Sequence, residues 1–445
     1  MNNKSRMFNL IKQTGLSAVY KVIAIGCSFL LVPMTLGYLG KEQYGLWMTM
    51  LTVLSWISLC DLGLGNGMRN AVTSALAENN IEKVRQYIST AYFLLLGIVG
   101  ILIFLILLFS DFVSWQKFFN IQSLSNSYLK HIAVFLCISS LLNFLIALIN
   151  QVANAYQKSS LTVVNQLIAN VMSLLTTYVV IKISNNEFFF IVCAYSLSLI
   201  LSNVAISFYF YRKNKNIIPS INYFRWENVK KISNDGIKFF LIQVSGLILL
   251  VKDNIIITQF LGPEYVTDYN LVYKLFSIFI LSMSLLMNPL WSAYGDAFAR
   301  NDFSWIKTTI KKMNILILVI GLGITMMAFL APMILHLWVG DIQIDNSLIY
   351  LMGIYTFIFV WSTGYSAFIN ASGKLRFSLY LMFLVVIINI PISIYMAKLY
   401  GLNGVVIATI LCMLPGAACA PIQYYFIVNE DNAKKLPGIY KIFLK

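Results

Sequence analysis

The chain has 445 residues, of which 59% are hydrophobic and only 11% are charged, and its formal net charge is +15. A soluble protein of this length carries about a quarter of its residues as charged side chains, so most of this surface faces something less polar than water. The composition therefore excludes a soluble globular protein and indicates one embedded in lipid.

Apolar runs of about 20 residues recur along the whole chain, without the alternation of polar and apolar residues typical of a membrane β-strand. Because a backbone in lipid must satisfy its own hydrogen bonds, we predict that these runs are helices. The expected fold class is all-α and integral to the membrane, with about twelve transmembrane helices. The predicted spans lie near residues 15–38, 44–66, 88–110, 129–151, 161–183, 188–211, 237–261, 267–294, 313–339, 347–370, 377–399 and 403–428.

Lysine and arginine are distributed unevenly over the connections between these spans. With the N-terminus placed in the cytoplasm, 23 of them fall on the cytoplasmic side and 5 on the other. Cytoplasmic loops of membrane proteins are enriched in these residues, so the asymmetry predicts that both termini are cytoplasmic. The positive charge is thereby explained by topology, and no nucleic-acid partner is expected.

The longest predicted cytoplasmic connection separates two groups of six spans. Within it, Trp226, Val229 and Ile232 are spaced as on one helical face among basic residues, which predicts a short helix on the anionic inner leaflet. The expected organisation is an N-terminal six-helix lobe (1–211), a cytoplasmic amphipathic connector (212–236), a C-terminal six-helix lobe (237–428) and a cytoplasmic basic tail (429–445).

The two halves resemble one another. A shift of 222 residues aligns Leu39-Gly40-Lys41-Glu42 with Leu261-Gly262-Pro263-Glu264 and, without a gap, pairs Asn66 with Asn288 and Asn79 with Asn301. A second match, at a shift of 216, pairs residues 154–158 with 370–374. Because each half holds an even number of spans, both halves insert in the same orientation. The expected architecture is two parallel-repeat six-helix bundles that work by alternating access.

Charged residues inside the spans are candidates for a functional site, because burying a charge is costly unless it faces a partner or a cavity. Lys21 and Asp61 lie about 9 and 8 Å from the cytoplasmic ends of the first two spans, at 1.5 Å per residue. Their equal depth predicts an ion pair, with a static structural role as the alternative. Arg69, which follows the second span, is also included in the candidate cavity.

Three further candidates lie in the seventh and eighth spans. Lys252 and Asp253 are about 12 Å from the external end of one span, and Lys274 is about 10 Å into the next. Adjacent helical residues point about 100° apart, so only one of the first two can face Lys274. We expect Asp253 to pair with Lys274 and Lys252 to face the cavity, with static ion pairs again as the alternative.

No enzymatic or metal-binding signature is present, since the chain lacks GxxxxGK[ST], HExxH, GxSxG, CxxC and CxxH spacings. We therefore expect no enzyme, no metal and no cofactor, with coupling to H⁺ or Na⁺ left open. A membrane glycosyltransferase or polysaccharide polymerase, which would be an enzyme and not an alternating-access transporter, stays as an alternative. The external loops are small for an enzyme of this kind.

Three segments carry a resemblance to a known family: residues 39–47 (LGKEQYGLW), residues 61–70 (DLGLGNGMRN) and Lys238-Phe239-Phe240. They resemble the O-antigen and capsule repeat-unit flippases, which form the polysaccharide-transporter branch of the multidrug/oligosaccharidyl-lipid/polysaccharide (MOP) superfamily. Drug exporters of the same superfamily, of the MATE type, share the expected twelve-helix layout, and a cation-coupled multidrug exporter therefore stays as a second alternative.

The resemblance implies a protein of the bacterial inner membrane that moves an undecaprenyl-diphosphate-linked oligosaccharide from the cytoplasmic to the periplasmic leaflet. This substrate is an O-antigen or capsule repeat unit of lipopolysaccharide or related polysaccharide biosynthesis. The partners implied are this lipid, the membrane and other polysaccharide-assembly membrane proteins. A candidate cavity with three lysines and two aspartates suits a doubly charged diphosphate better than a cationic drug.

Overall fold

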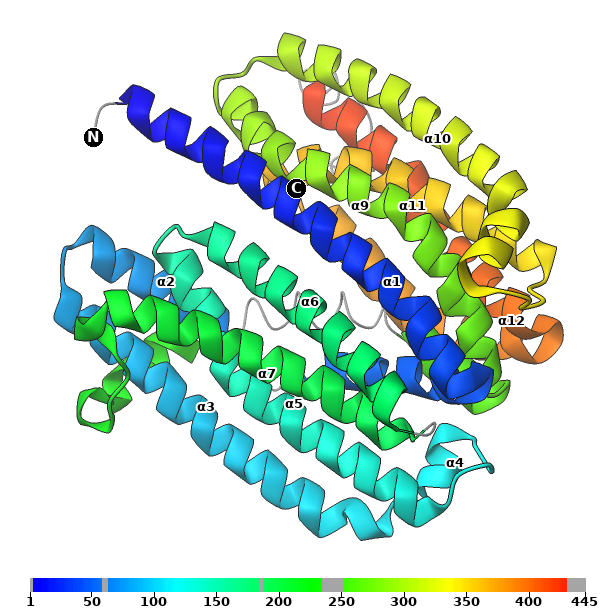
Figure 1. Ribbon diagram of the computed structural model, residues 1–445. Coiled ribbons are helices and arrows are strands. Elements are labelled where there is room, and N and C mark those ends of the chain that lie inside the picture. The colour runs from blue at the N-terminus through cyan, green and yellow to red at the C-terminus, as the bar shows by residue number, and fades with distance from the viewer. Residues whose placement is uncertain (1–2, 58–62, 185–186, 234–251, 430–445) are drawn as a thin grey trace. The chain divides into compact units, whose positions relative to one another are not determined.

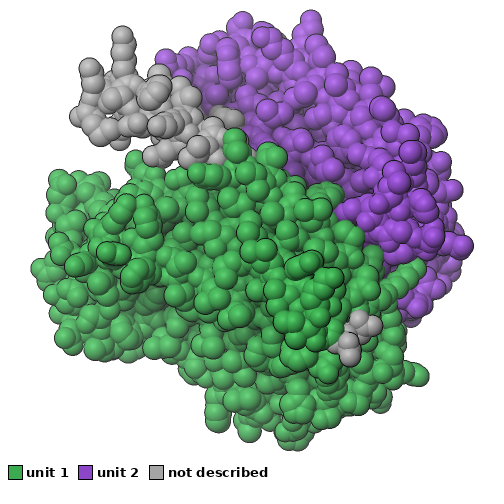
Figure 2. All heavy atoms as spheres, in the orientation of Figure 1, with its two compact units in different colours: residues 1–247 green, residues 248–445 purple. Residues whose placement is uncertain are grey.

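The computed structural model describes residues 3–57, 63–184, 187–233 and 252–429. The chain divides into two compact units, residues 1–247 and 248–445, which are coloured separately in Figure 2. All regular structure in the described ranges is helical (Figure 1). The bounds assigned from sequence to the lobes, the connector and the tail stay predictions.

The described residues of unit 1 form seven labelled α-helices. Among them, α6 packs against α1 and α7, and α5 packs against α3 and α7. Short 3₁₀ turns at Ser110–Phe112, Lys215–Ile217 and Ile221–Tyr223 and a helical segment at 226–233 complete the described part of the unit. The labelled helices are α1 (Asn3–Ile57), α2 (Leu64–Ala77), α3 (Ile81–Phe109), α4 (Trp115–Phe119), α5 (Asn126–Ala155), α6 (Ser159–Ile183) and α7 (Phe188–Lys213).

Unit 2 begins, in its described part, with a helical segment at 252–260. Helix α11 lies against α9, α10 and α12, so that it forms the centre of the unit. A core of buried apolar residues, among them Met283, Ile317 and Phe368, joins these helices. The labelled helices are α9 (Pro263–Ala299), α10 (Phe303–Val339), α11 (Asn346–Ser372) and α12 (Arg376–Val428).

Nine helices of the described ranges are long and apolar enough to cross a membrane. Two of them, α1 and α12, are each divided by a glycine with positive φ, Gly40 (φ 74°) and Gly401 (φ 59°). Counted on both sides of these breaks, the nine helices correspond to eleven of the predicted spans. The remaining predicted span, 237–261, is described only from residue 252. The all-helical, multi-span fold expected from the sequence is confirmed.

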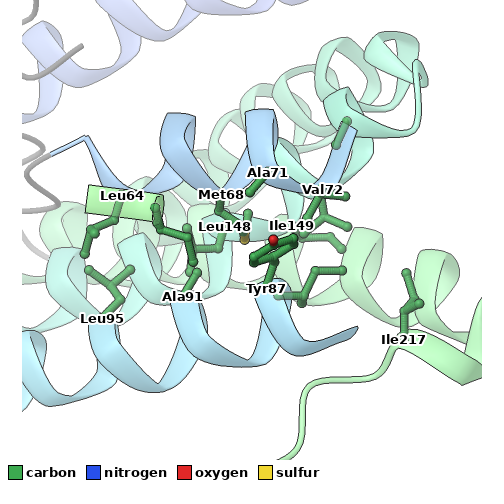
Figure 3. Packing of buried hydrophobic residues seen from close by; sticks show 14 of the residues in the cluster. Leu64, Met68, Ala71, Val72, Tyr87, Ala91, Leu95, Leu148, Ile149 and Ile217 are labelled. Atoms are coloured by element: carbon green, nitrogen blue, oxygen red, sulfur yellow. The ribbon is translucent and has the colours of Figure 1, made fainter. Parts of the chain in front are cut away.

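Helix α2 was not expected from the sequence. It starts after Gly63 (φ 76°) and runs as a separate helix where a cytoplasmic loop was predicted. Its apolar residues Leu64, Met68 and Val72 recur every four positions and are buried, whereas its other face is polar and exposed. Figure 3 shows this apolar face packed on α3 and α5. A search for continuous apolar runs misses an amphipathic helix of this kind, because polar residues interrupt its apolar face along the sequence.

The connector after α7 is partly held in the core of unit 1. Ile217 and Ile232 are almost fully buried in the cluster that includes Tyr87 of α3 (Figure 3 shows Ile217). The predicted short helix is present at 226–233, but its apolar residues do not share one surface, because Ile232 is 0% exposed and Trp226 is 74% exposed.

The repeat is visible in the backbone. Asn79 and Asn301, which are paired by the shift of 222, have φ of 56° and 57°. This left-handed backbone conformation has a higher free energy for most other non-glycine residues than for asparagine. The next residue in each unit, Asn80 or Asp302, caps the following helix by accepting a hydrogen bond from the backbone N–H three residues later.

Further paired positions share the same property. Gly40 and Gly262 both have positive φ, and the shift of 216 pairs Gln157 (φ 57°) with Gly373 (φ 71°). The two units therefore repeat the same turns between helices, which supports the internal repeat identified in the sequence.

Candidate functional site

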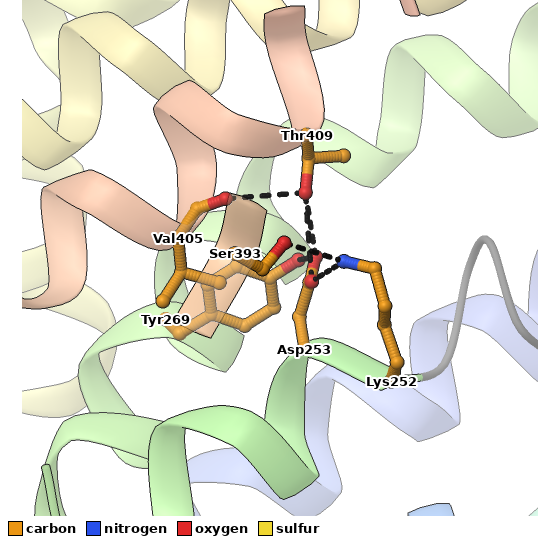
Figure 4. A network of polar contacts seen from close by, with 6 residues as sticks. All are labelled: Lys252, Asp253, Tyr269, Ser393, Val405 and Thr409. Carbon is orange, nitrogen blue, oxygen red and sulfur yellow. Dashed lines mark hydrogen bonds and ion pairs between the residues drawn. The ribbon is translucent and has the colours of Figure 1, made fainter. Parts of the chain in front are cut away.

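A buried ion pair lies at the start of the described part of unit 2. Lys252 and Asp253, on the helical segment 252–260, are 3% and 4% exposed. The Lys252 Nζ lies 2.5 Å from Asp253 Oδ1 and donates a second hydrogen bond to Ser393 Oγ at 3.2 Å. Two adjacent residues of one helical segment therefore form an ion pair with one another inside unit 2 (Figure 4).

Neutral groups from two other helices hold the carboxylate. The Tyr269 hydroxyl of α9 donates to Asp253 Oδ2 at 3.0 Å. The Thr409 hydroxyl of α12 lies 3.4 Å from the same oxygen and 3.1 Å from the carbonyl oxygen of Val405 (Figure 4). A hydroxyl has one hydrogen, so Thr409 is shared between these two acceptors. The charges lose hydration when buried, and these contacts offset part of that loss.

The break in α12 explains how this helix reaches the ion pair twice. Ser393 lies before Gly401 and Thr409 lies after it, so the positive φ of Gly401 turns the chain back toward the same carboxylate. The two segments approach closely at Gly404, where an added Cβ would lie 1.9 Å from the carbonyl oxygen of Met396. Only glycine permits this approach.

A cavity of about 340 Å³ within unit 2 reaches Thr409, which contacts Asp253 of the ion pair. Its lining near the pair includes Asn389 and Thr409, and Asn389 precedes Ser393 by one helical turn. Asn389 is 1% exposed, and in the described part of the chain its Oδ1 has no hydrogen-bond partner. A buried acceptor of this kind is suited to bind a polar ligand or water.

The other end of the cavity lies where α11 ends and α12 begins. There the Ser378 hydroxyl donates to Gln423 Oε1 at 2.9 Å, and Gln423 Nε2 donates to the backbone carbonyl of Lys374 at 2.8 Å. Asn389 follows Ser378 by 11 residues on α12, which is about 16 Å along a helix. The cavity is therefore elongated, with polar groups at both ends.

The pairing predicted for Asp253 was wrong. The described contacts of Asp253 are with Lys252, Tyr269 and Thr409, whereas the sequence predicted a pair with Lys274 of α9. The prediction treated helical neighbours as pointing apart. A lysine side chain has four rotatable bonds, however, and is long enough to turn back to the next residue. Lys252 is consequently buried within unit 2, and Lys274 is partly exposed.

The remaining candidates from the sequence are not brought together in the described structure. Lys21 of α1 is partly exposed, and Arg69 of α2 is exposed. Asp61 lies outside the described residues, so the Lys21/Asp61 pair stays a prediction.

Sequence reasoning missed the neutral members of the site, Tyr269, Asn389, Ser393 and Thr409. It searched the spans for charges, and single hydroxyl or amide groups are common in membrane helices. A usable signal was the spacing of Asn389 and Ser393, which places two polar groups on one face of an otherwise apolar helix.

Unit 1 holds a polar cluster of a different kind, which the sequence reading also missed. Asn165 of α6 donates to the side-chain oxygens of Asn150 and Asn203 at 3.0 and 2.7 Å. Asn203 of α7 donates in turn to Asn143 of α5 at 2.9 Å. These neutral amide contacts tie three helices together, as side-chain hydrogen bonds commonly do in membrane bundles.

Solved structures with a similar fold are membrane transporters. A multidrug resistance MATE family transporter of the MOP superfamily, in an inward-facing conformation, matches with a TM-score of 0.69 and 15% identity, covering 92% of this chain and 94% of the other. A mutant of a Vibrio cholerae MATE transporter matches with a TM-score of 0.65 and 13% identity, covering 98% and 99%. The chain therefore has a MATE-like fold.

The family model described as polysaccharide biosynthesis protein matches residues 10–289, and the MatE model matches residues 237–395. The chain belongs to the polysaccharide biosynthesis protein family. This family and the relatives described next confirm the resemblance seen in the sequence and the expectation of a transporter rather than an enzyme.

Two relatives are similar over most of their length. A Yersinia pseudotuberculosis protein named for O-antigen export is 23% identical over 372 residues, covering 80% of this chain and 82% of its own. A Salmonella typhi protein named as an O-antigen transporter is 23% identical over 403 residues, covering 88% and 90%.

Proposed function

We propose that this protein is a flippase that moves an undecaprenyl-diphosphate-linked oligosaccharide, an O-antigen or related repeat unit, from the cytoplasmic to the periplasmic leaflet of the inner membrane. The observation that carries the proposal is the similarity, over four fifths or more of the chain, to relatives named for O-antigen export or transport. The repeated units and the MATE-like fold support alternating access as the mechanism.

The charges of the candidate site support an anionic substrate. Lys252 is a cation within a span, and one carboxylate, that of Asp253, neutralises it. A diphosphate carries up to two negative charges and attracts an ammonium more strongly than one carboxylate does at the same distance. In this proposal Lys252 exchanges Asp253 for the substrate diphosphate during transport, and Lys274, Lys21, Asp61 and Arg69 are further candidates for the pathway.

A cation-coupled multidrug exporter is the competing function. The similar solved structures include multidrug transporters, but at 13–15% identity they support the fold alone. A cationic drug would need an uncompensated anion, whereas Asp253 is already paired with Lys252. The flippase is therefore the better supported function.

Substitution of Lys252 tests the proposal in cells that lack their own flippase. Lys252→Arg keeps the positive charge and is expected to retain part of the transport, whereas Lys252→Ala is expected to leave lipid-linked repeat units on the inner leaflet. Lys398→Ala, at an exposed lysine of α12, is the matched control and is expected to transport normally. Full surface polysaccharide from Lys252→Ala at native expression would contradict a role of Lys252 in substrate binding.

A further inference from the structure

Three cations gather at one end of unit 1, where α6 begins and α7 ends. Lys158 directly precedes α6, and Arg212 and Lys213 are the last residues of α7. The two helices are joined by a short connection and pack together, so they run in opposite directions and these cations share one end of the helix pair. In the topology predicted from the charge asymmetry, this end lies on the cytoplasmic side of the membrane.

Aromatic side chains of α7 hold two of these cations. The Lys213 Nζ donates a hydrogen bond to the Tyr209 hydroxyl at 2.8 Å. The Lys158 Nζ lies 5.4 Å from the centroid of the Phe210 ring, within the range of a cation–π contact. Because Tyr209 and Phe210 are adjacent, the two ammonium groups are held against neighbouring positions of one helix. Both contacts are with neutral groups, so they leave the positive charges in place.

No carboxylate neutralises these cations in the part of the chain that the structure describes. Lys158, Arg212 and Lys213 are exposed. The ion pairs of the described residues join other side chains, such as Lys83 and Glu78 of the same unit. This end of the helix pair therefore offers three positive charges to an anion from outside the chain.

An exposed apolar strip of α7 leads up to the cations. Leu201, Val204 and Phe208 are 39%, 44% and 68% exposed and recur every three or four residues, so they lie on one face of the helix. Arg212 follows Phe208 by four residues and lies on the same face. From Leu201 to Phe208 the strip is about 10 Å long, which fits within one leaflet of a hydrocarbon core about 30 Å thick.

We propose that this end of unit 1 is a binding site for one anionic phospholipid of the inner leaflet. The lipid phosphate contacts Lys158, Arg212 and Lys213, and its acyl chains cover the apolar strip. The Tyr209 hydroxyl accepts from Lys213 and keeps its own hydrogen to donate to the phosphate. The inference does not depend on the proposed function, because this lipid is a neighbour of the protein and is not transported.

The chemistry of the surface favours this ligand over other anions. A phospholipid joins a negative headgroup to apolar chains, and the surface joins three cations to an apolar strip of matching depth. The cytoplasmic leaflet contains anionic lipids that attract lysine and arginine at the membrane surface. A soluble anion would use the cations alone and leave the strip uncovered, and a zwitterionic lipid would bring no net charge to them.

Native mass spectrometry of the full-length protein in a neutral detergent, with phosphatidylglycerol or phosphatidylcholine added, tests the site. The wild type is expected to bind phosphatidylglycerol more tightly than phosphatidylcholine. Arg212→Gln/Lys213→Gln is expected to weaken phosphatidylglycerol binding roughly 30-fold, because each basic residue near an anionic lipid contributes about 1 kcal/mol. Lys158→Gln alone is expected to weaken it about fivefold, which shows that the turn before α6 shares the site with α7.

Lys311→Gln/Lys312→Gln is the matched control, since it removes two exposed cations of α10 on the same predicted side of the membrane. It is expected to leave phosphatidylglycerol binding unchanged. An equal loss in this control, or equal affinity of the wild type for the two lipids, would overturn the proposal. Displacement of bound phosphatidylglycerol by an equal concentration of inorganic phosphate, or of the lipid-linked oligosaccharide, would also overturn it, because the cations would then serve a soluble anion or the transported substrate.

Discussion

At the scale of single residues, the main feature of unit 2 is the buried ion pair of Lys252 and Asp253, whose lost hydration must be compensated by contacts within the protein. An ammonium or carboxylate loses several kcal/mol of hydration when it is taken out of water. Lys252 and Asp253 recover part of this through one another and through Ser393, Tyr269 and Thr409. Each single charge is therefore tolerated only while the other is present.

A double-mutant cycle tests this coupling. Lys252→Met alone leaves the Asp253 carboxylate as an uncompensated charge, and this variant is expected to lose about 3–5 kcal/mol of unfolding free energy. Asp253→Asn alone leaves a poorly satisfied amide beside Lys252. The double variant is expected to lose less than the sum of the two, as measured by unfolding in detergent. The exposed pair Lys83/Glu78, at 3.5 Å, is the control and is expected to contribute about 0–1 kcal/mol. Strict additivity at Lys252/Asp253 would contradict the coupling.

The sequence identified both charged residues of this pair but not their contacts. Charges inside spans are rare enough to be noticed, so Lys252 and Asp253 could be selected directly. Their pairing depends on a side-chain rotamer, and the partners Ser393 and Thr409 come from helical segments more than 130 residues away in the chain. Neither property is contained in a hydropathy pattern.

At the scale of helices, the apolar runs predicted the spans well, because a transmembrane helix must be apolar over its whole membrane thickness. The ends differ where a helix continues into water. For example, α10 begins at Phe303 and not near 313, because Asp302 caps the helix and the mostly polar stretch 307–312 is part of it. The breaks at Gly40 and Gly401 fall between predicted spans, as expected for chain reversals, and α2 was missed because it is amphipathic.

The close approach within α12 gives a prediction at this scale. Gly404→Ala would place a methyl group 1.9 Å from the carbonyl oxygen of Met396, so the two segments of α12 must move apart. We expect a loss of stability well above the roughly 1–3 kcal/mol of ordinary overpacking, and weakened contact between Thr409 and Asp253. Gly416→Ala, which meets nothing closer than 4.0 Å, is the control. A wild-type melting temperature for Gly404→Ala in detergent would contradict the packing.

At the scale of the whole molecule, the repeat and the charge asymmetry together predict a topology. The repeat could be recognised from sequence because it preserves positions, such as Asn79 and Asn301, whose backbone conformation few residues tolerate.

Reporter fusions test the topology. Fusions after Lys41, Lys117, Lys182, Glu264 and Asp341 are expected to report the periplasm. Those after Lys83, Lys215, Lys312 and Lys435 are expected to report the cytoplasm. The expectation follows from 23 basic residues on one side against 5 on the other. A cytoplasmic signal at Lys117 would contradict it.

Transport of a defined substrate by the purified protein tests the central proposal most directly. The protein is reconstituted in liposomes with a fluorescent undecaprenyl-diphosphate-linked oligosaccharide, and a membrane-impermeant quencher reports how much of the label has changed leaflet. The flippase proposal predicts that the wild type moves the label, that Lys252→Ala does not, and that Lys398→Ala moves it normally. Folded wild-type protein that leaves the label in its original leaflet, while it transports a cationic dye, would contradict the proposal and favour a drug exporter.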